Sequence, residues 1–454
     1  MEDLISLREY ERIPYRICNN SDDEGLNKER NTVIITEESL NQLETLIKDT
    51  KFLEIHHTYF RTLNYAGVAK VGNLKIEILP KFFDGDDSES DKAKIMNNLL
   101  YMLQHSDLFN FKELDNADLD IKNDFLEVFI YIFAKNLAQL LKAQQDRQYL
   151  KIEDELRFVR EKIITSRYSS NPARLHVIPC RFHQRSMDNL LNQTIKYTAY
   201  LLANQVKSQE TSRYLKFIIS LLDAVELTQI HPSEIRKIKL NRLNKAFIPY
   251  IRFCELFLRH TTLTLQASRV EFFSLMIPME KLFESFIAEM LIQHKDEVLP
   301  SEYCDSILHP QYAIGYLAYD EDRELFEMVP DIFLDGPRQI ILDTKYKMLS
   351  QDDIRNNISQ TDLYQIYAYC KESGSHIAIL LYPEGINKEI PCREFRLGNE
   401  KSITLYVKTI PLHFDLSKDI GVQEFIYEIS KIFSFLPSAT EKTLKQVSVK
   451  ELIA

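Results

Sequence analysis

The chain has 454 residues, of which 45% are hydrophobic and 27% are charged, and its formal net charge is −11. This length exceeds what one ordinary hydrophobic core accommodates, so two or three folded domains are expected. No apolar run of about 18 residues occurs, and the chain begins with the acidic Met1-Glu2-Asp3, which argues against a membrane span and a signal peptide.

The first part of the chain, residues 1–83, is predicted to be a mainly β domain. One helix is expected near Glu37–Lys48, and Gly72-Asn73 is a two-residue sequence that favours a tight hairpin turn. The stretch Asp84–Asp91 is rich in Asp, Ser and Gly and is therefore expected to be an exposed linker. These features predict a domain boundary after residue 83.

Residues 92–265 are predicted to form a helical middle domain. Strand-like stretches near Leu156–Ile164 and Leu175–Phe182 interrupt the helical pattern, and a further helix is expected to begin after Ser186. The remaining residues, 270–436, contain alternating helical and strand patterns and are predicted to form an α/β domain with a closing helix near Val422–Phe435. The expected fold class is therefore α+β with several domains.

Charge is distributed unevenly along the chain. Residues 1–141 contain 16 basic and 26 acidic residues (−10), residues 142–260 contain 21 and 11 (+10), and residues 261–454 contain 19 and 30 (−11). The basic middle third is the expected surface for the phosphates of double-stranded DNA. A solvated basic helix face or a contact with an acidic domain would also explain it. The candidate DNA-binding residues are Arg157, Arg160, Arg174 and Arg181.

A β-hairpin is predicted where two apolar runs, Val329–Leu334 and 339–345, flank a turn that contains Asp, Gly and Pro. With a turn near Gly336 and Pro337, Asp331 lies opposite Leu342 or Asp343, so the two carboxylates converge at one end of the hairpin. This convergence makes the end of the hairpin the first candidate site.

Lys345 lies two residues beyond Asp343, and the period-2 alternation of a strand sends both side chains to the same face. Two carboxylates and one ammonium group suit Mg²⁺-assisted hydrolysis of a phosphodiester. The tripeptide Asp343-Thr344-Lys345 alone is weak evidence, because similar tripeptides occur by chance in a highly charged chain. A structural ion pair with Lys345 would explain one carboxylate but not two that converge.

Two helices are predicted beside this hairpin. The helix upstream begins at Pro278 and carries Glu284 close to its apolar face, as either a third metal-binding carboxylate or a surface glutamate. The helix downstream is capped by Ser359 and places Gln365 and Tyr369 on one face, because they are four residues apart. A buried strand, His376–Pro383, is expected to follow. The order is therefore helix, hairpin, helix and strand.

Pro330-Asp331 and Asp343-Thr344-Lys345 resemble the signature of the PD-(D/E)xK nucleases, whose core has this order of elements. The wider chain resembles McrC, the nuclease subunit of McrBC-type modification-dependent restriction systems. The segments that carry this resemblance are Ile5–Glu11, Val71–Lys81, Asn98–Leu103, the Leu-Phe-Glu-Ser-Phe helix, the PD…DTK hairpin and the Tyr-Gln-Ile-Tyr-Ala-Tyr helix. One departure is Arg160-Glu161-Lys162-Ile163, where the family commonly has an Arg-Gly-Arg-Ile-like segment.

The resemblance implies a C-terminal restriction-endonuclease-like core in which Asp331, Asp343 and Glu284 bind Mg²⁺. Lys345 would position water or stabilise the phosphate, and Gln365 would orient Lys345 or the phosphate. It also implies a separate AAA+ GTPase partner of the McrB type, with residues 1–83 docking into the motor, through the Phe52–Phe82 hairpin, and stimulating GTP hydrolysis.

The chain itself contains no P-loop, so GTP would be used by the partner. Its six cysteines are scattered without a Cys-x-x-Cys pair, which favours reduced thiols and a cytoplasmic location. Two alternatives stay open: an activator of the motor with a vestigial site, and a stand-alone PD-(D/E)xK repair or transposition endonuclease. The intact Asp/Asp/Lys set argues against the first, and the family-like N-terminal half argues against the second.

Overall fold

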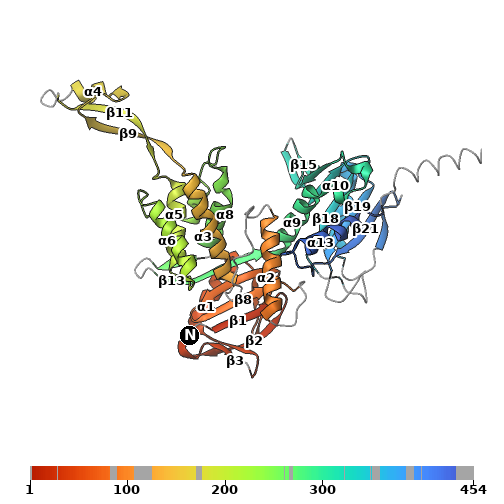
Figure 1. Ribbon diagram of the computed structural model, residues 1–454. Coiled ribbons are helices and arrows are strands. Elements are labelled where there is room, and N and C mark those ends of the chain that lie inside the picture. Colours follow the sequence, from red (N-terminus) through yellow and green to blue (C-terminus); the bar gives the residue numbers. More distant parts are fainter. Residues whose placement is uncertain are drawn as a thin grey trace, which may run out of the picture. The chain divides into compact units, whose positions relative to one another are not determined.

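The computed structural model has a mixed α/β fold with several sheets (Figure 1). It describes residues 3–27, 29–81, 89–106, 125–169, 176–259, 261–264, 269–321, 323–347, 349, 358–384, 393–399 and 401–435. Contacts between residues divide the chain into two compact units. Unit 1 comprises Met1–Leu119 and Met276–Ala454, and unit 2 comprises Asp120–Leu275.

The N-terminal region of unit 1 is mainly β-structure with one α-helix, as predicted. Its elements are β1 (Asp3–Arg8), β2 (Arg12–Cys18), β3 (Gly25–Asn27), β4 (Thr32–Thr36), α1 (Glu37–Asp49), β5 (Leu53–Ile55), β6 (Tyr59–Thr62), β7 (Tyr65–Val71) and β8 (Leu74–Leu79). Strands β3, β4, β2, β6 and β5 form one sheet, while β8 pairs with β1 in parallel and with β7 in antiparallel orientation. We call these elements the N-terminal β region.

The predicted turn at Gly72-Asn73 connects β7 and β8. Gly72 has a φ of +54°, and a Cβ atom there would lie 2.3 Å from Ser39 Oγ, so both conformation and space favour glycine. The expectation of a single Phe52–Phe82 hairpin is wrong. Within that stretch β5–β6 and β7–β8 are separate hairpins, because the first pairs with β2 and the second with β1.

Helix α2 (Glu89–Gln104) begins inside the stretch 84–91 that was predicted to be a linker, and residues 84–88 of that stretch lie outside the described part of the chain. The helix packs on the C-terminal part of unit 1. Asn98 donates a hydrogen bond to Phe414 O (2.6 Å) and accepts one from Leu416 N (2.9 Å), and it is fully buried. These bonds attach α2 to the C-terminal part of unit 1.

Unit 2 contains a group of helices and a β-ribbon that projects from them (Figure 1). The helices are α3 (Phe125–Ala143), α5 (Leu190–Ala203), α6 (Gln209–Leu221), α7 (Pro232–Ile235) and α8 (Ile248–Arg259). The ribbon consists of β9 (Gln148–Leu156), β10 (Lys162–Ile163), α4 (Thr165–Ser169) and β11 (Ile178–Ser186). Strands β12 (Thr261–Thr264) and β13 (Arg269–Pro278) form an antiparallel pair, and β13 continues the chain into unit 1.

Two predicted boundaries in unit 2 are wrong. The stretch predicted near Leu156–Ile164 contains only the last residue of β9 and the two residues of β10, and Phe158 and Val159 between them are exposed. Helix α5 begins at Leu190, not directly after Ser186, because the side chain of Asn189 accepts a hydrogen bond from Asn192 N (3.0 Å) and caps the helix.

The C-terminal part of unit 1 is built on a six-stranded sheet with the strand order β14-β17-β18-β19-β21-β20. Its strands are β14 (Ile307–Pro310), β17 (Ile332–Asp335), β18 (Ile340–Thr344), β19 (Ile377–Pro383), β20 (Arg393–Leu397) and β21 (Ile403–Ile410). Strands β18, β19 and β21 are parallel, and β18 and β19 are buried throughout. Strands buried on both faces read as continuous apolar runs, which is how the strand His376–Pro383 was predicted; β19 begins one residue later, at Ile377.

The helices around this sheet are α9 (Met279–Gln293), α10 (Lys295–Val298), α12 (Gln360–Ser373) and α13 (Asp419–Ile432). A separate hairpin, β15 (Gly315–Asp320) and β16 (Arg323–Met328), precedes β17. The predicted capping of α12 is confirmed, since Ser359 Oγ accepts a hydrogen bond from Asp362 N (3.1 Å). Among the described helices, none has the length and apolarity that crossing a membrane requires.

Candidate active site

The predicted hairpin is formed by β17 and β18. Ile332 pairs with Leu342, so the next positions outward, Asp331 and Asp343, lie at the same end of the hairpin. Asp331 Oδ2 accepts hydrogen bonds from the backbone N–H and the hydroxyl of Thr344, both at 2.7 Å. The prediction that the two aspartates converge is therefore confirmed, and Thr344 fixes the orientation of the first.

Lys345 and Asp343 lie on one face, as the strand alternation predicted. Lys345 Nζ is 2.5 Å from Asp343 Oδ2, and the two side chains are 15% and 1% exposed. This is a close and largely buried ion pair, in which the ammonium group of Lys345 lies against the Asp343 carboxylate.

Gln365 and Tyr369 extend this arrangement from α12. Lys345 Nζ donates to Gln365 Oε1 at 3.4 Å, Gln365 Nε2 donates to Tyr369 OH at 2.7 Å, and Tyr369 OH donates to Val329 O at 3.0 Å. The chain of bonds ends two residues before Asp331. It therefore connects the lysine to the segment that leads into the first aspartate.

Glu284 reaches the site from α9, where it is half-buried. The side-chain amide of Gln311 donates to Glu284 Oε1 and approaches Asp331 Oδ1 at 3.4 Å, while its backbone N–H donates to Asp331 O at 2.9 Å. Gln311 has a φ of +49°, in the left-handed region. Sequence reasoning missed Gln311, because it lies in no motif and reaches the site only through tertiary packing.

The carboxyl groups of the site raise one another's pKa. Burial, and then the charges of Asp331 and Asp343, raise the pKa of Glu284 to about 7. Burial and the charge of Asp331 likewise raise the pKa of Asp343, while Lys345 opposes this shift. Burial also raises the pKa of Asp331 against the two bonds from Thr344. For Lys345 burial lowers the pKa, but Asp343 outweighs it and the net shift is upward.

This electrostatic pattern fits a divalent cation. When ionised, three carboxylates and one ammonium group carry −3 and +1, which leaves −2 in a largely buried place. Oxygen ligands of this kind are those that Mg²⁺ prefers. As the side chains lie, no three His, Cys, Asp or Glu residues in the described part of the chain already form a metal-binding cluster. Gln311 and Lys345 instead contact the carboxylates.

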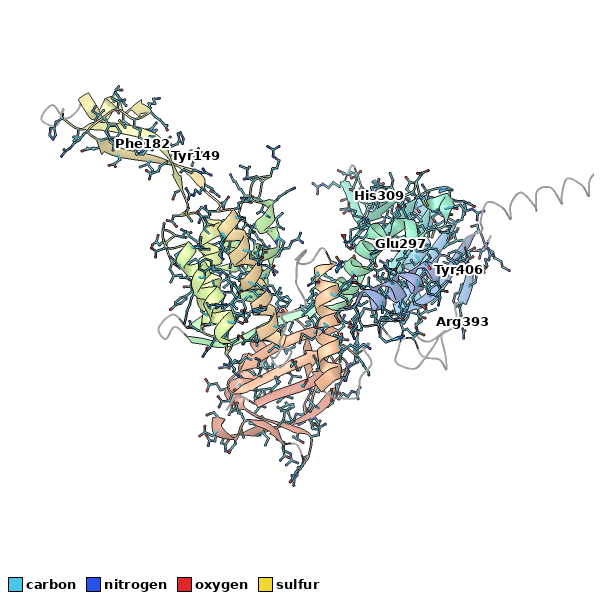
Figure 2. The ribbon with its side chains drawn as sticks, viewed as in Figure 1. Tyr149, Phe182, Glu297, His309, Arg393 and Tyr406 are labelled. Atoms are coloured by element: carbon cyan, nitrogen blue, oxygen red, sulfur yellow. The ribbon has the colours of Figure 1, made fainter. Side chains whose placement is uncertain are left out.

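The predicted DNA-binding arginines belong to the ribbon of unit 2, apart from Arg174, which lies outside the described residues. Arg181 Nη2 is 2.7 Å from Glu153 Oε1, and the guanidinium carbon of Arg160 is 4.1 Å from the ring centre of Phe182. Figure 2 shows Phe182 and Tyr149 on this ribbon. Arg157 is exposed. The ribbon also exposes Tyr149 (70%), Phe158 (63%) and Val159 (55%). It is thus a mixed surface, with aromatic and aliphatic side chains beside its charges.

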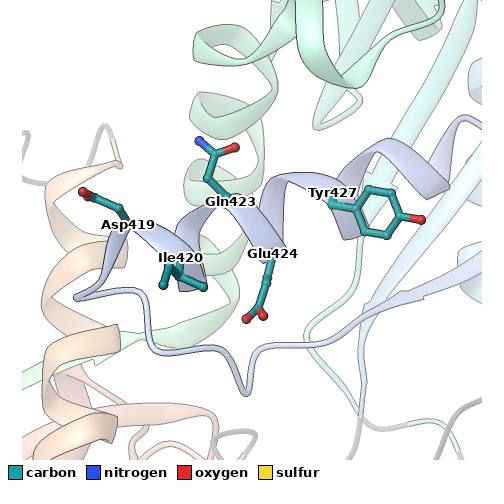
Figure 3. Close-up of a pocket in the computed structure, with 5 residues that line it drawn as sticks. All are labelled: Asp419, Ile420, Gln423, Glu424 and Tyr427. Carbon is teal, nitrogen blue, oxygen red and sulfur yellow. The ribbon is translucent and has the colours of Figure 1, made fainter.

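A shallow concave surface lies on α13 (Figure 3). Asp419, Ile420, Gln423, Glu424 and Tyr427 line it, all from one helix. Its lining includes none of the predicted catalytic or metal-binding residues. The convergence of carboxylates at the β17–β18 hairpin is therefore the stronger candidate for chemistry.

Comparison with known proteins identifies a family and solved structures that resemble this chain. Residues 60–383 match the family model described as McrBC 5-methylcytosine restriction system component. One similar structure is a half-complex from the tetradecameric assembly of Thermococcus gammatolerans McrB AAA+ hexamers with bound McrC. The match to it has 18% sequence identity and a TM-score of 0.63, and it covers 94% of this chain and 100% of that chain. A second similar structure is that of the Thermococcus gammatolerans McrBC complex. The match to it has 20% sequence identity and a TM-score of 0.48, and it covers 64% of this chain and 88% of that chain. No curated protein matches.

Proposed function

The chain belongs to the family of McrBC 5-methylcytosine restriction system components, and from this membership and the site geometry we propose that it is the DNA endonuclease subunit of such a system. The observation that carries the proposal is the meeting of Asp331, Asp343 and Lys345 at the ends of β17 and β18, beside Glu284. We propose that this part of unit 1 is a PD-(D/E)xK core that cleaves phosphodiester bonds with Mg²⁺.

In this proposal Asp331, Asp343 and Glu284 would hold the metal ion. When bound, Mg²⁺ would supply Lewis-acid stabilisation and a more acidic water molecule. Lys345 keeps its proton, because its pKa is raised, and its ammonium group can stabilise the negative charge that builds on the scissile phosphate. Gln365, which accepts a hydrogen bond from Lys345 and is itself fixed by Tyr369, would orient that ammonium group.

We further propose that the chain stimulates an AAA+ GTPase of the McrB type. McrB AAA+ hexamers accompany McrC in the archaeal assembly whose McrC shares this fold. Two surfaces compete for the motor contact: residues 1–83, as the family resemblance implies, and the ribbon of unit 2. Exposed aromatic residues are frequent anchors of protein interfaces, and the ribbon exposes Tyr149 and Phe158. This exposure favours the ribbon.

The substrate in this proposal is double-stranded DNA, with Arg157, Arg160, Arg174 and Arg181 among its contacts. Glu153 already pairs with Arg181, so the ribbon offers phosphates less positive charge than the sequence count implies. Weak binding of DNA by the chain alone follows, and the motor would bring the DNA to the nuclease site.

The test is an Asp343→Asn variant of the full chain, assayed with its AAA+ partner, GTP, Mg²⁺ and DNA. The substitution keeps the shape of the side chain and removes one charge, so cleavage should be lost while stimulation of GTP hydrolysis stays at the wild-type level. Cleavage at the wild-type rate would exclude the assigned site. A wild-type chain that stimulates the motor but never cuts would instead be a non-cleaving activator, and efficient cutting without a motor would indicate a stand-alone endonuclease.

A further inference from the structure

Glu9 is an acidic residue in the interior of unit 1. It follows β1 and is 0% exposed, although an ionised carboxylate is costly to bury. Its Oε2 accepts hydrogen bonds from Tyr346 OH at 2.9 Å and from the backbone N–H of Lys81 at 3.0 Å. Its Oε1 has no hydrogen-bond partner among the described residues. A buried group that is only partly satisfied requires an explanation beyond stability.

Tyr346 connects Glu9 to the candidate active site. It directly follows Lys345, whose backbone N–H donates to Leu381 O at 2.9 Å and so extends the pairing of β18 with β19. Tyr346 is 4% exposed, and its ring centre is 5.8 Å from that of Phe283. Phe283 precedes Glu284 on α9. Tyr346 therefore contacts the helix that carries Glu284 and is covalently next to the lysine.

A second bond joins the N-terminal β region to the same helix. The backbone N–H of Met279, the first residue of α9, donates to the carbonyl oxygen of Asn64 at 3.0 Å. Asn64 lies between β6 and β7. The N-terminal β region therefore contacts both elements that carry the site residues. Asn64 binds the start of α9, which carries Glu284, and Glu9 binds Tyr346, which follows Lys345.

We propose that Glu9 and Tyr346 are positioning residues for the nuclease site. Their hydrogen bond fixes the segment after Lys345 against α9, and so makes the rate of cleavage depend on the N-terminal β region. The inference rests on the proposed nuclease function and deepens it. The competing explanation is that the bond only stabilises the fold.

The surroundings of Glu9 provide a matched pair of variants. Burial raises the pKa of Glu9 to about 8, so the side chain is mostly uncharged at neutral pH. Glu9→Gln keeps the size, the neutral charge and a carbonyl oxygen that can accept from Tyr346 and Lys81. Glu9→Ala removes that acceptor, and Tyr346→Phe removes only the donor. Tyr303→Phe changes another buried tyrosine of unit 1, 2% exposed, and serves as the control.

The experiment measures single-turnover cleavage of DNA at saturating Mg²⁺ by the full chain with its AAA+ partner, together with GTP hydrolysis. Displacement of a reacting group by about 1 Å costs roughly 10²-fold in rate, so Tyr346→Phe and Glu9→Ala should each slow cleavage by roughly 10- to 100-fold. Glu9→Gln and Tyr303→Phe should cleave near the wild-type rate. All four variants should stimulate GTP hydrolysis like the wild type, with an unchanged half-saturating Mg²⁺ concentration.

The double variant, Glu9→Ala with Tyr346→Phe, should be no slower than the slower single variant, because both remove the same bond. Wild-type cleavage by Tyr346→Phe overturns the positioning role. So does an equal loss of cleavage and of GTPase stimulation, since that pattern indicates general damage to the fold. A wild-type complex that does not cleave overturns the proposed nuclease function itself, and this result differs from the first two because it is seen before any substitution.

Discussion

The candidate active site and the ribbon of unit 2 both gather charged side chains, but in opposite surroundings. In the site Asp343 is 1% exposed, and neighbouring carboxylates raise the pKa values of Glu284 and Asp343. On the ribbon Arg181 and Glu153 pair at the surface, where water screens their charges. Burial makes a few charges interact strongly, whereas exposure leaves many charges weakly coupled. We therefore expect chemistry from the first region and association from the second.

After Asp343→Asn, the largest effect should follow from removing the buried ammonium group. Lys345→Ala deletes the cation that neighbours Asp343 and faces the proposed phosphate position. Loss of one preorganised charge stabiliser typically lowers the rate by about 10²–10³. Lys347 lies two residues further on and pairs with Asp362. Lys347→Ala is the matched control, because it removes an ammonium group that is close to Lys345 in the sequence but more exposed. Equal losses in single-turnover cleavage for both variants would mean that Lys345 has no special role.

The core of the site was predictable because its signals are local. Turn residues and period-2 alternation join Asp331, Asp343 and Lys345 within one hairpin, and helical spacing places Gln365 beside Tyr369. Gln311 carried no such signal, since its partners lie 20 and 27 residues away and its backbone adopts a left-handed conformation. These contacts depend on how separate elements pack, which a pattern along the chain does not encode.

The ribbon was predicted less accurately for a related reason. Its first strand exposes most of its side chains, so the alternation of buried and exposed residues that identifies a strand is weak there. The predicted stretch near Leu156–Ile164 includes the apolar Phe158 and Val159, which lie between β9 and β10 and are exposed. Apolar residues predict burial only on average. Phe158 and Val159 stay exposed, and their exposure is the reason for proposing a partner contact on the ribbon.

The second prediction compares the two surfaces that compete for the motor. Phe158→Glu on the ribbon should reduce stimulation of the partner's GTP hydrolysis roughly tenfold or more, as expected for an exposed aromatic anchor. Ile17→Glu introduces the same charge on the N-terminal β region, where Ile17 is 56% exposed, and should have little effect. The reverse result would assign docking to residues 1–83.

Deletion of residues 1–83 is not a clean test of docking. It would also remove Glu9 and Asn64, which hold Tyr346 and the start of α9. Loss of cleavage by such a truncated chain would therefore follow from either a lost motor contact or a misplaced nuclease site. Single surface substitutions separate the two explanations.

The third prediction concerns stability of unit 1 as a function of pH. A carboxyl group with a raised folded pKa binds its proton more tightly when folded, so the stability that Glu284 contributes falls as the pH rises from 4.5 to about 7, and the contribution of Glu9 falls up to about pH 8. Mg²⁺ competes with these protons. It should raise the Tm clearly at about pH 8 and little at about pH 5.

Glu284→Gln removes one of the repelling charges. The metal-free variant should have a higher Tm than the wild type at about pH 8, by a few degrees, and a smaller increase with Mg²⁺. Thermal unfolding at both pH values, with and without Mg²⁺, measures these shifts. A Tm that responds to neither pH nor Mg²⁺ would contradict the coupling of the three carboxylates.

The smallest effect should come from the exposed arginines of the ribbon. Each phosphate contact that is lost makes the dependence of log K on log salt concentration shallower by about 0.9. Arg157 is exposed, whereas Arg181 is already paired with Glu153, so Arg157→Ala should change the slope for DNA binding more than Arg181→Ala does. Measuring affinity for duplex DNA across a range of salt concentrations separates the two variants. If neither changes the slope, the ribbon faces protein only, and its arginines serve the motor contact that Phe158→Glu tests. If Arg181→Ala has the larger effect, the ion pair between Arg181 and Glu153 must open when DNA binds. An exposed ion pair is weak, so the phosphate could replace Glu153 at little cost in free energy.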